Sequence, residues 1–174
     1  MARKITMSLS TDSIQKAIDE LNKYNDELTY KARLLAEKLA EQGVEIARVQ
    51  ISSLNAVFTG KLLASVRASY VGSMPSGGIW AVVSDSDHAV FVEFGTGIIG
   101  KNSPYTGKLP DGVSWQYASG KTIRQLSDGR YGWFYLGKNG KWYFTEGMPS
   151  RPFMLMTANE LKRKVKAVAK EVFG

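Results

Sequence analysis

The chain of 174 residues contains no cysteine and one histidine, His88. Without cysteine it forms no disulfide, has no thiolate nucleophile and builds no zinc–thiolate site. With one histidine, a histidine-rich metal centre cannot form within one protomer, and a Ser-His-Asp triad would depend on His88 alone. These absences exclude several common kinds of catalytic centre.

Long hydrophobic runs are also missing. No stretch approaches the ~18 apolar residues that a membrane-spanning helix needs, and no apolar block follows the positive charges of the first residues. We therefore expect no membrane partner and no secretory signal. Hydrophobic residues still make up 44% of the sequence and aromatic residues 11%, which is enough for a packed core. The length predicts a single domain, residues 1–174.

Positive charge is in excess, with 23 Lys and Arg against 16 Asp and Glu and a net charge of +7. This balance suits a nucleic-acid partner, and it is equally typical of a basic surface in contact with solvent. We favour the solvated surface, and the charge alone decides nothing about the fold.

Residues 1–58 predict a long amphipathic helix. Asp12, followed by Gln15, indicates a capping box at its start, while Asn22, Asn25 and Gly43 are places where the helix can kink or break. We interpret its apolar stripe as facing the core, because the charge pairs of a free coiled coil are not clear. The stripe has helical spacing and consists of Ile14, Ile18, Leu21, Leu28, Ala32, Leu35 and Leu39.

Residues 149–174 predict a second helix. Ser150 is its expected cap, and Pro152 is expected in its first turn. Its apolar stripe comprises Met154, Ala158, Leu161, Val165, Val168 and Val172, and its opposite face carries Lys162, Arg163, Lys166 and Lys170. The chain thus begins and ends with long helices.

The middle of the chain predicts a small antiparallel sheet. Residues 59–94 indicate a short helix capped by Thr59 and a β-hairpin over 65–85, whereas "HAVFVEF" fits either a helix or a strand. Gly, Pro, Ser and Asn dominate residues 95–131 and predict a long loop. Aromatic runs that flank "GKNG" predict a second hairpin over 132–146. The fold class is therefore α+β, with an antiparallel sheet packed against the two long helices.

The glycines of "FGTGIIGK" match two nucleotide-binding patterns. Gly95, Gly97 and Gly100 fit G-x-G-x-x-G, and with Lys101 they fit G-x-x-x-x-G-K. A phosphate cradle also needs a helix that begins inside the motif and continues, but the Pro and Gly residues from Pro104 onward exclude a helix of useful length. We therefore expect no nucleotide cofactor. The glycines instead indicate positive φ or close backbone approach.

Four side chains come nearest to an acid/base or metal cluster: Asp85, Asp87, His88 and Glu93. Their spacing matches no metal-ligand motif, so we expect no metal and interpret the first three as a polar turn. Glu93 stands among apolar neighbours, where a carboxylate needs hydrogen bonds from the backbone or from an arginine, because unpaired burial is costly. Arg67 and Arg151 are candidate arginines.

Large aromatic side chains gather in the second half of the chain. Beside lysines they can stack on single-stranded bases, and they can equally anchor a protein interface. We favour core packing together with a protein interface. The side chains concerned are Trp115, Tyr117, Trp133, Phe134, Tyr135, Trp142, Tyr143 and Phe144.

Three blocks carry a family resemblance: "TGKLLASV" (59–66), "HAVFVEFGTG" (88–97) and "GMPSRPFMLMTA" (147–158). In this order and rough spacing the sequence resembles the tail-completion, or head–tail connector, proteins of long-tailed phages and prophages, typified by gene product ten of a lambdoid siphophage. It departs from the pattern at Phe58, where Asp is usual, at His88, where Tyr is common, and in its long aromatic insertion, 98–146.

This resemblance implies a structural virion protein rather than an enzyme. Its subunits would form a ring, most simply a hexamer, at the neck. They would contact head-connector and tail-tube or tail-terminator proteins, with DNA passing through the lumen, after assembly in the bacterial host cytoplasm. We expect the 98–131 loop to order on assembly. Two alternatives stay open: a basic nucleic-acid-binding protein, and a small enzyme using Glu93, His88 and Asp85.

The resemblance and the aromatic positions together define the candidate interface or structural residues. They are Glu93, Phe94, Gly95, Thr96, Gly97, Trp115, Tyr117, Trp133, Trp142, Arg151, Pro152 and Phe153. No catalytic, cofactor-binding or metal-binding residue is predicted.

Overall fold

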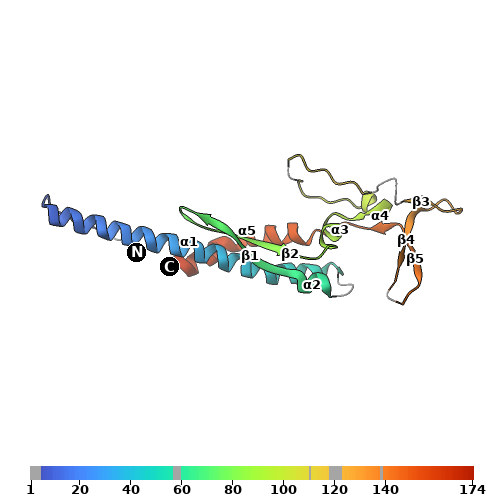
Figure 1. The fold of residues 1–174 in the computed structure, drawn as a ribbon, viewed down its shortest axis with the longest axis horizontal. Coiled ribbons are helices and arrows are strands. Elements are labelled where there is room, and N and C mark those ends of the chain that lie inside the picture. The colour runs from blue at the N-terminus through green and yellow to red at the C-terminus, as the bar shows by residue number, and fades with distance from the viewer. Residues whose placement is uncertain (1–4, 57–59, 110, 118–122, 138) are drawn as a thin grey trace. The chain divides into compact units, whose positions relative to one another are not determined.

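A computed structural model describes residues 5–56, 60–109, 111–117, 123–137 and 139–174 (Figure 1). The expected α+β fold, with long terminal helices and antiparallel strands between them, is confirmed. The strands form two separate sheets, of two and three strands, rather than the single sheet predicted. The chain forms two compact units. The first comprises Met1–Glu45, Arg67–Val83 and Glu160–Gly174, and the second comprises Ile46–Val66 and Ser84–Asn159.

Helix α1 spans Thr11–Ser53 without interruption, 43 residues in all. The expected weak points at Asn22, Asn25 and Gly43 do not break it, because intrahelical hydrogen bonds on either side outweigh a cost of about 1 kcal/mol or less for each poor helix former. A break at these residues was an alternative that the structure does not adopt.

The start of α1 is capped differently from the prediction. Ser10 Oγ accepts a hydrogen bond from the N–H of Ser13 at 3.4 Å, and Ser10 O accepts one from the N–H of Ile14 at 3.0 Å. Gln15 donates to Asp19 rather than reaching back to the helix start. The predicted Asp12–Gln15 capping box is therefore wrong, and Ser10 is the cap.

The first unit joins parts of α1 to a β-hairpin and to the end of α5. Strands β1 (Val66–Met74) and β2 (Gly77–Ser84) form a two-stranded sheet, which confirms the hairpin predicted over 65–85. Helix α5 spans Phe153–Phe173, and Lys38 of α1 pairs with Glu171 near its end.

At Gly43 these three elements approach one another closely. A Cβ atom placed on Gly43 would lie 2.5 Å from Val82 Cγ2 of β2 and 3.0 Å from Leu161 Cδ1 of α5. The absence of a side chain lets the hairpin and α5 pack directly on the α1 backbone. Ala40, Val44 and Val168 are buried in the same unit.

The apolar stripe of α1 is not buried along its whole length. Ile14, Ile18, Leu21 and Leu28 are all exposed, while the buried apolar residues of α1 lie mostly in its second half: Ala17, Ala40, Val44, Ala47 and Ile51. The expectation that the stripe faces the core is wrong for the first half of the helix, because no other element among the described residues of this unit covers it.

The second unit is built around the end of α1 and the start of α5. Its buried side chains include Ile51, Leu62 and Val66, together with Phe153 at 1% exposure. Helix α2 (Lys61–Ser65) follows Gly60, which has φ 75°. The expected cap, Thr59, lies outside the described residues.

The remaining elements of this unit are short. Helices α3 (Ala89–Phe94) and α4 (Gly97–Asn102) are followed by strands β3 (Arg124–Gln125), β4 (Tyr131–Leu136), β5 (Trp142–Thr145) and β6 (Gly147–Met148). The predicted second hairpin is confirmed as β4 and β5, and "HAVFVEF" is a helix. The segment 95–131 contains α4 and β3 as well as loop.

We predict that Gly43→Leu destabilises the protein. The added side chain must displace Val82 and Leu161, and overpacking of this kind costs about 1–3 kcal/mol of unfolding free energy. Urea unfolding measures the loss. The matched control is Glu41→Leu, which places the same side chain at an exposed position two residues earlier and should change stability little. Equal stability of the two variants would contradict the packing at Gly43.

Candidate functional site

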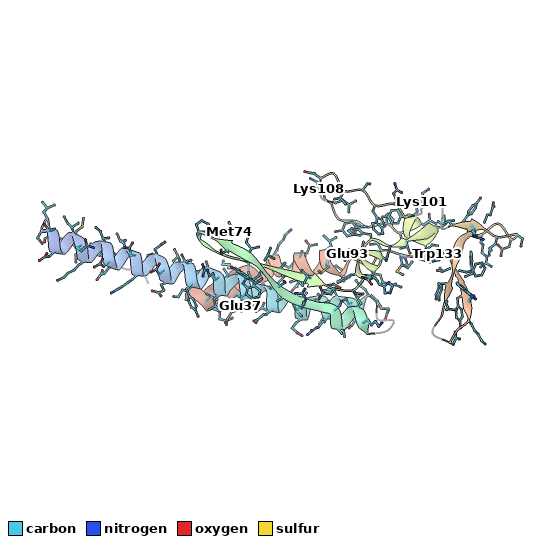
Figure 2. All side chains as sticks on the ribbon, in the orientation of Figure 1. Glu37, Met74, Glu93, Lys101, Lys108 and Trp133 are labelled. Carbon is cyan, nitrogen blue, oxygen red and sulfur yellow. The ribbon has the colours of Figure 1, made fainter. Side chains whose placement is uncertain are left out.

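Glu93 connects two helices that are distant in the sequence. It is buried on α3, at the position labelled in Figure 2, and its carboxylate reaches the first turn of α5. Oε2 accepts a hydrogen bond from the N–H of Met154 at 2.8 Å, and Oε1 accepts one from the N–H of Leu155 at 3.0 Å. The first turn of a helix leaves N–H groups without intrahelical partners. Glu93 therefore caps α5 from about sixty residues away in the chain.

Two further hydrogen bonds attach the residues just before α5 to α3. Ser150 Oγ donates to Glu93 O at 2.6 Å, and the N–H of Arg151 donates to Val92 O at 2.8 Å. Ser150 thus binds the end of α3 and does not cap α5, so that prediction is wrong. Pro152 lies one residue before α5 rather than in its first turn.

The environment of Glu93 changes its acidity. Burial raises the pKa of its carboxyl above the ordinary value of 4.5, and the hydrogen bonds from the Met154 and Leu155 N–H groups offset part of this effect. Of the two kinds of partner considered for this carboxylate, the structure uses backbone N–H groups rather than Arg67 or Arg151. The negative charge of Glu93 also raises the pKa of Tyr105, although burial of the Tyr105 hydroxyl is the larger cause.

The glycines that follow Glu93 form a close backbone crossing with β6. Thr96 pairs with Met148 and Gly97 with Gly147 in antiparallel bridges, and Gly95, Gly97 and Gly147 have φ of 79°, 66° and 106°. A Cβ atom on Gly95 would lie 2.6 Å from the backbone N of Ser150, and one on Gly147 would lie 2.5 Å from the carbonyl carbon of Thr96. The predicted need for positive φ and close approach is confirmed.

This crossing also accounts for the apparent nucleotide motif. Helix α4 begins at Gly97, inside the motif, but is only six residues long and ends at Asn102. Gly100 is needed because a Cβ atom there would lie 2.9 Å from the carbonyl carbon of Gly95 and 3.0 Å from Met148 O. The glycine spacing therefore serves the packing of backbone on backbone.

Part of the predicted loop folds over this crossing. Trp115 Nε1 donates to Gly95 O at 2.9 Å, the N–H of Gly97 donates to Tyr117 O, and Tyr117 Oη accepts from the N–H of Tyr105 at 3.0 Å. Trp115 and Tyr117 are thereby attached to the crossing, and Tyr105 is attached to Tyr117.

An aromatic cluster covers the same region. The rings of Phe94 and Tyr105 are 4.7 Å apart between centroids, those of Phe94 and Trp115 are 5.1 Å apart, and those of Phe91 and Trp115 are 6.0 Å apart. Such pairs add about 0.5–1.5 kcal/mol each beyond the area that they bury. Trp115 and Tyr117, predicted as interface or structural residues, pack within their own chain.

We call this assembly of α3, α4, β6 and the start of α5 the junction. It brings together most of the candidate residues, including the resemblance blocks 88–97 and 147–158. Trp133 and Trp142 lie on the β4–β5 hairpin instead. The buried hydroxyl of Thr96 has no hydrogen-bond partner within the described part of the chain, and nothing in the structure explains it.

The acid/base cluster considered in the sequence is dispersed. His88 and Asp87 are exposed, whereas Glu93 is buried against α5. Across residues 5–56, 60–109, 111–117, 123–137 and 139–174, no three His, Asp or Glu side chains are grouped so that they could hold a metal ion. Over the same ranges, no helix combines the length and apolarity that crossing a membrane requires.

Sequence reasoning missed the remote cap. The available signals were a lone carboxylate in an apolar segment and a helix start, "RPFMLM", that lacks a Ser, Thr, Asp or Asn at the residue before Phe153. Comparison of the chain with protein families, with curated proteins and with solved structures found no match.

We predict that the stability advantage of the wild type over Glu93→Gln decreases as the pH rises from 4.5 towards neutrality. The raised pKa means that the folded state binds the proton more tightly than the unfolded state does. The resulting stabilisation is therefore complete below the ordinary pKa and is lost as the pH passes the folded pKa. Urea unfolding of both proteins across this pH range measures the difference. A difference that grows with pH would show that the α5 hydrogen bonds outweigh burial.

We also predict that Gly147→Ala costs more than about 3 kcal/mol of unfolding free energy, because the new methyl group meets the Thr96 backbone as well as an unfavourable φ. Gly112→Ala is the matched control. Gly112 has φ 80° but no atom within 4 Å of an added Cβ. Its replacement by Ala therefore costs only the unfavourable backbone conformation, about 1–2 kcal/mol of unfolding free energy. Thermal unfolding of both variants measures the difference. Equal decreases in melting temperature would contradict the close backbone crossing at Gly147.

Proposed function

We propose that the chain is a structural subunit of the neck of a tailed phage or prophage-derived particle, where copies assemble into a ring that completes the tail and joins it to the head. One observation carries the proposal. The resemblance blocks 88–97 and 147–158, some fifty residues apart, pack on each other in one junction. The residues of these blocks that match the family pattern are the ones that form this contact.

The chemistry of the junction supports a structural role. The Glu93 carboxylate is engaged by two backbone N–H groups, and the glycines admit a backbone crossing that no side chain would allow. A catalytic carboxylate must reach a substrate, whereas this one is buried and occupied by a helix terminus. The motif thus works as a joint that holds α3 against α5.

Exposed apolar surface supports assembly with other protein subunits. The β4–β5 hairpin exposes Phe134, Leu136 and Trp142, and the first half of α1 exposes Leu21 and Leu28. Contiguous exposed apolar patches in a globular protein mark interaction sites. A virion subunit is a protein that reaches its final state only when such surfaces are covered by its neighbours.

A second candidate function rests on the basic face of α5. Lys162, Arg163, Lys166 and Lys170 are all exposed on this face. Phosphate contacts by such residues release counterions, so that binding weakens steeply with salt. The face is suited either to DNA passing through a ring lumen or to a nucleic-acid-binding protein that acts outside a virion.

The test is deletion of the gene in the phage or prophage that encodes it. We expect heads and tails to accumulate unjoined, as seen by electron microscopy, and expression of the wild-type protein in trans to restore joined particles. Gly147→Ala should fail to restore them and Gly112→Ala should restore them, since only the first disrupts the junction. Normal joined particles in the deletion strain would overturn the proposal. DNA binding by the isolated protein with a steep salt dependence, in that case, would favour the second candidate.

A further inference from the structure

The β4–β5 hairpin is apolar on both faces. Alternate residues of a strand point to opposite sides of a sheet, and Phe134 pairs with Phe144 while Tyr135 pairs with Tyr143. The first pair has ring centroids 5.3 Å apart and the second 5.7 Å apart. One face therefore carries Phe134, Leu136, Trp142 and Phe144, and the other carries Trp133, Tyr135, Tyr143 and Thr145.

The hairpin leaves this surface open. Trp142 is 67% exposed and Leu136 is 58% exposed. Strand β3 pairs with Tyr131 and Gly132 at the start of β4, and the rest of the β4–β5 hairpin extends away from that pairing (Figure 1). A two-stranded ribbon has no interior of its own, because each face needs a second layer to cover it. From Tyr131 to Thr145 the sequence carries two lysines and no acidic residue. This surface is aromatic and cationic.

The first half of α1 is a second open surface, with the opposite charge. Every residue from Ile18 to Leu28 is exposed, and within the first unit this half lies beyond the end of α5 (Figure 1). The side chains of its apolar stripe, Ile14, Ile18, Leu21 and Leu28, are exposed. From Thr11 to Lys31 the sequence carries five acidic and three basic side chains.

Charge decides how these surfaces pair between copies. Two α1 segments are both negative and two hairpins are both positive, so each repels its own kind, whereas a hairpin attracts an α1 segment. The acidic residues lie mainly on the flanks and back of the α1 stripe. The attraction still acts across the helix, because the screening length of about 8–10 Å at physiological salt is similar to the helix diameter of about 10 Å. The apolar stripe and the aromatic face then supply the buried contact.

We propose that the β4–β5 hairpin of one copy packs on the exposed half of α1, Thr11–Lys31, of the next copy. The contact joins two different surfaces, so each bound copy still presents one hairpin or one α1 segment to a further copy. Heterologous contacts of this kind build a closed ring when the rotation between copies closes. The inference rests on the proposed neck function and names the surfaces that would form its ring.

The test uses two variants that each lose one surface. The hairpin variant is Phe134→Ser with Trp142→Ser, and the α1 variant is Leu21→Ser with Leu28→Ser. All four positions are exposed, so both variants should keep the wild-type circular dichroism spectrum. The matched control is Val71→Ser with Ile79→Ser, two exposed apolar residues on β1 and β2. Light scattering coupled to size-exclusion chromatography measures the mass of each protein.

We expect the wild type and the control to assemble, and each of the other variants to be monomeric by itself. A mixture of the two should form a one-to-one heterodimer and nothing larger. The α1 variant supplies an intact hairpin and the hairpin variant supplies an intact α1, which permits one contact only. A photo-crosslinking residue in place of Trp142 in the otherwise unchanged protein should attach to the peptide containing residues 11–31, and this readout does not depend on how the serine variants fold.

Other outcomes overturn the inference. Assembly of the hairpin variant alone would indicate an α1–α1 coiled coil, and assembly of the α1 variant alone would indicate a hairpin–hairpin contact. A mixture that stays monomeric, a wild type that is monomeric at every concentration, or crosslinks confined to other residues would also exclude it. The neck function is judged separately by the deletion strain. Unjoined heads and tails with a monomeric protein would therefore leave that function standing and remove only this contact.

Discussion

The hydrogen bonds from the first turn of α5 to the buried Glu93 carboxylate are the interaction on which the second unit depends. They provide acceptors for N–H groups in the first turn of α5 that have no partner within the helix. They also offset part of the free-energy cost of burying the charged carboxylate. Because the same link places α3 beside the start of α5, it also brings the glycine segment to β6. The aromatic cluster of Phe94, Tyr105 and Trp115 then closes over the result.

The glycines show why a pattern of residue types does not define a chemistry. A phosphate cradle and a backbone crossing both need positive φ and the absence of Cβ atoms, so both select glycine. They differ in what approaches the backbone: an anion in one case, and here the chain itself, through Gly97 and Gly147. Helix α4, which lasts six residues, completes the crossing rather than presenting a long dipole to a ligand.

The exposed surfaces extend this reasoning to assembly. A buried, hydrogen-bonded junction gives the second unit a stable centre, while the hairpin and the first half of α1 keep apolar side chains in water. Exposed area of this kind is unfavourable for an isolated chain and favourable once a neighbour covers it. The resemblance blocks and the open surfaces therefore differ in role: the former shape the second unit, and the latter carry the proposed contact between copies.

Local sequence by itself determined the two long helices, both hairpins and the positive-φ glycines, since helical periodicity, alternation and turn residues act over a few positions. Only the tertiary structure decided that α1 buries Ala40, Val44 and Ile51 while exposing Leu21 and Leu28, because burial depends on which distant elements reach each turn. It also decided that "HAVFVEF" is a helix, and that Glu93 rather than Ser150 caps α5. Both outcomes arise from contacts between residues far apart in the chain, which no local pattern encodes.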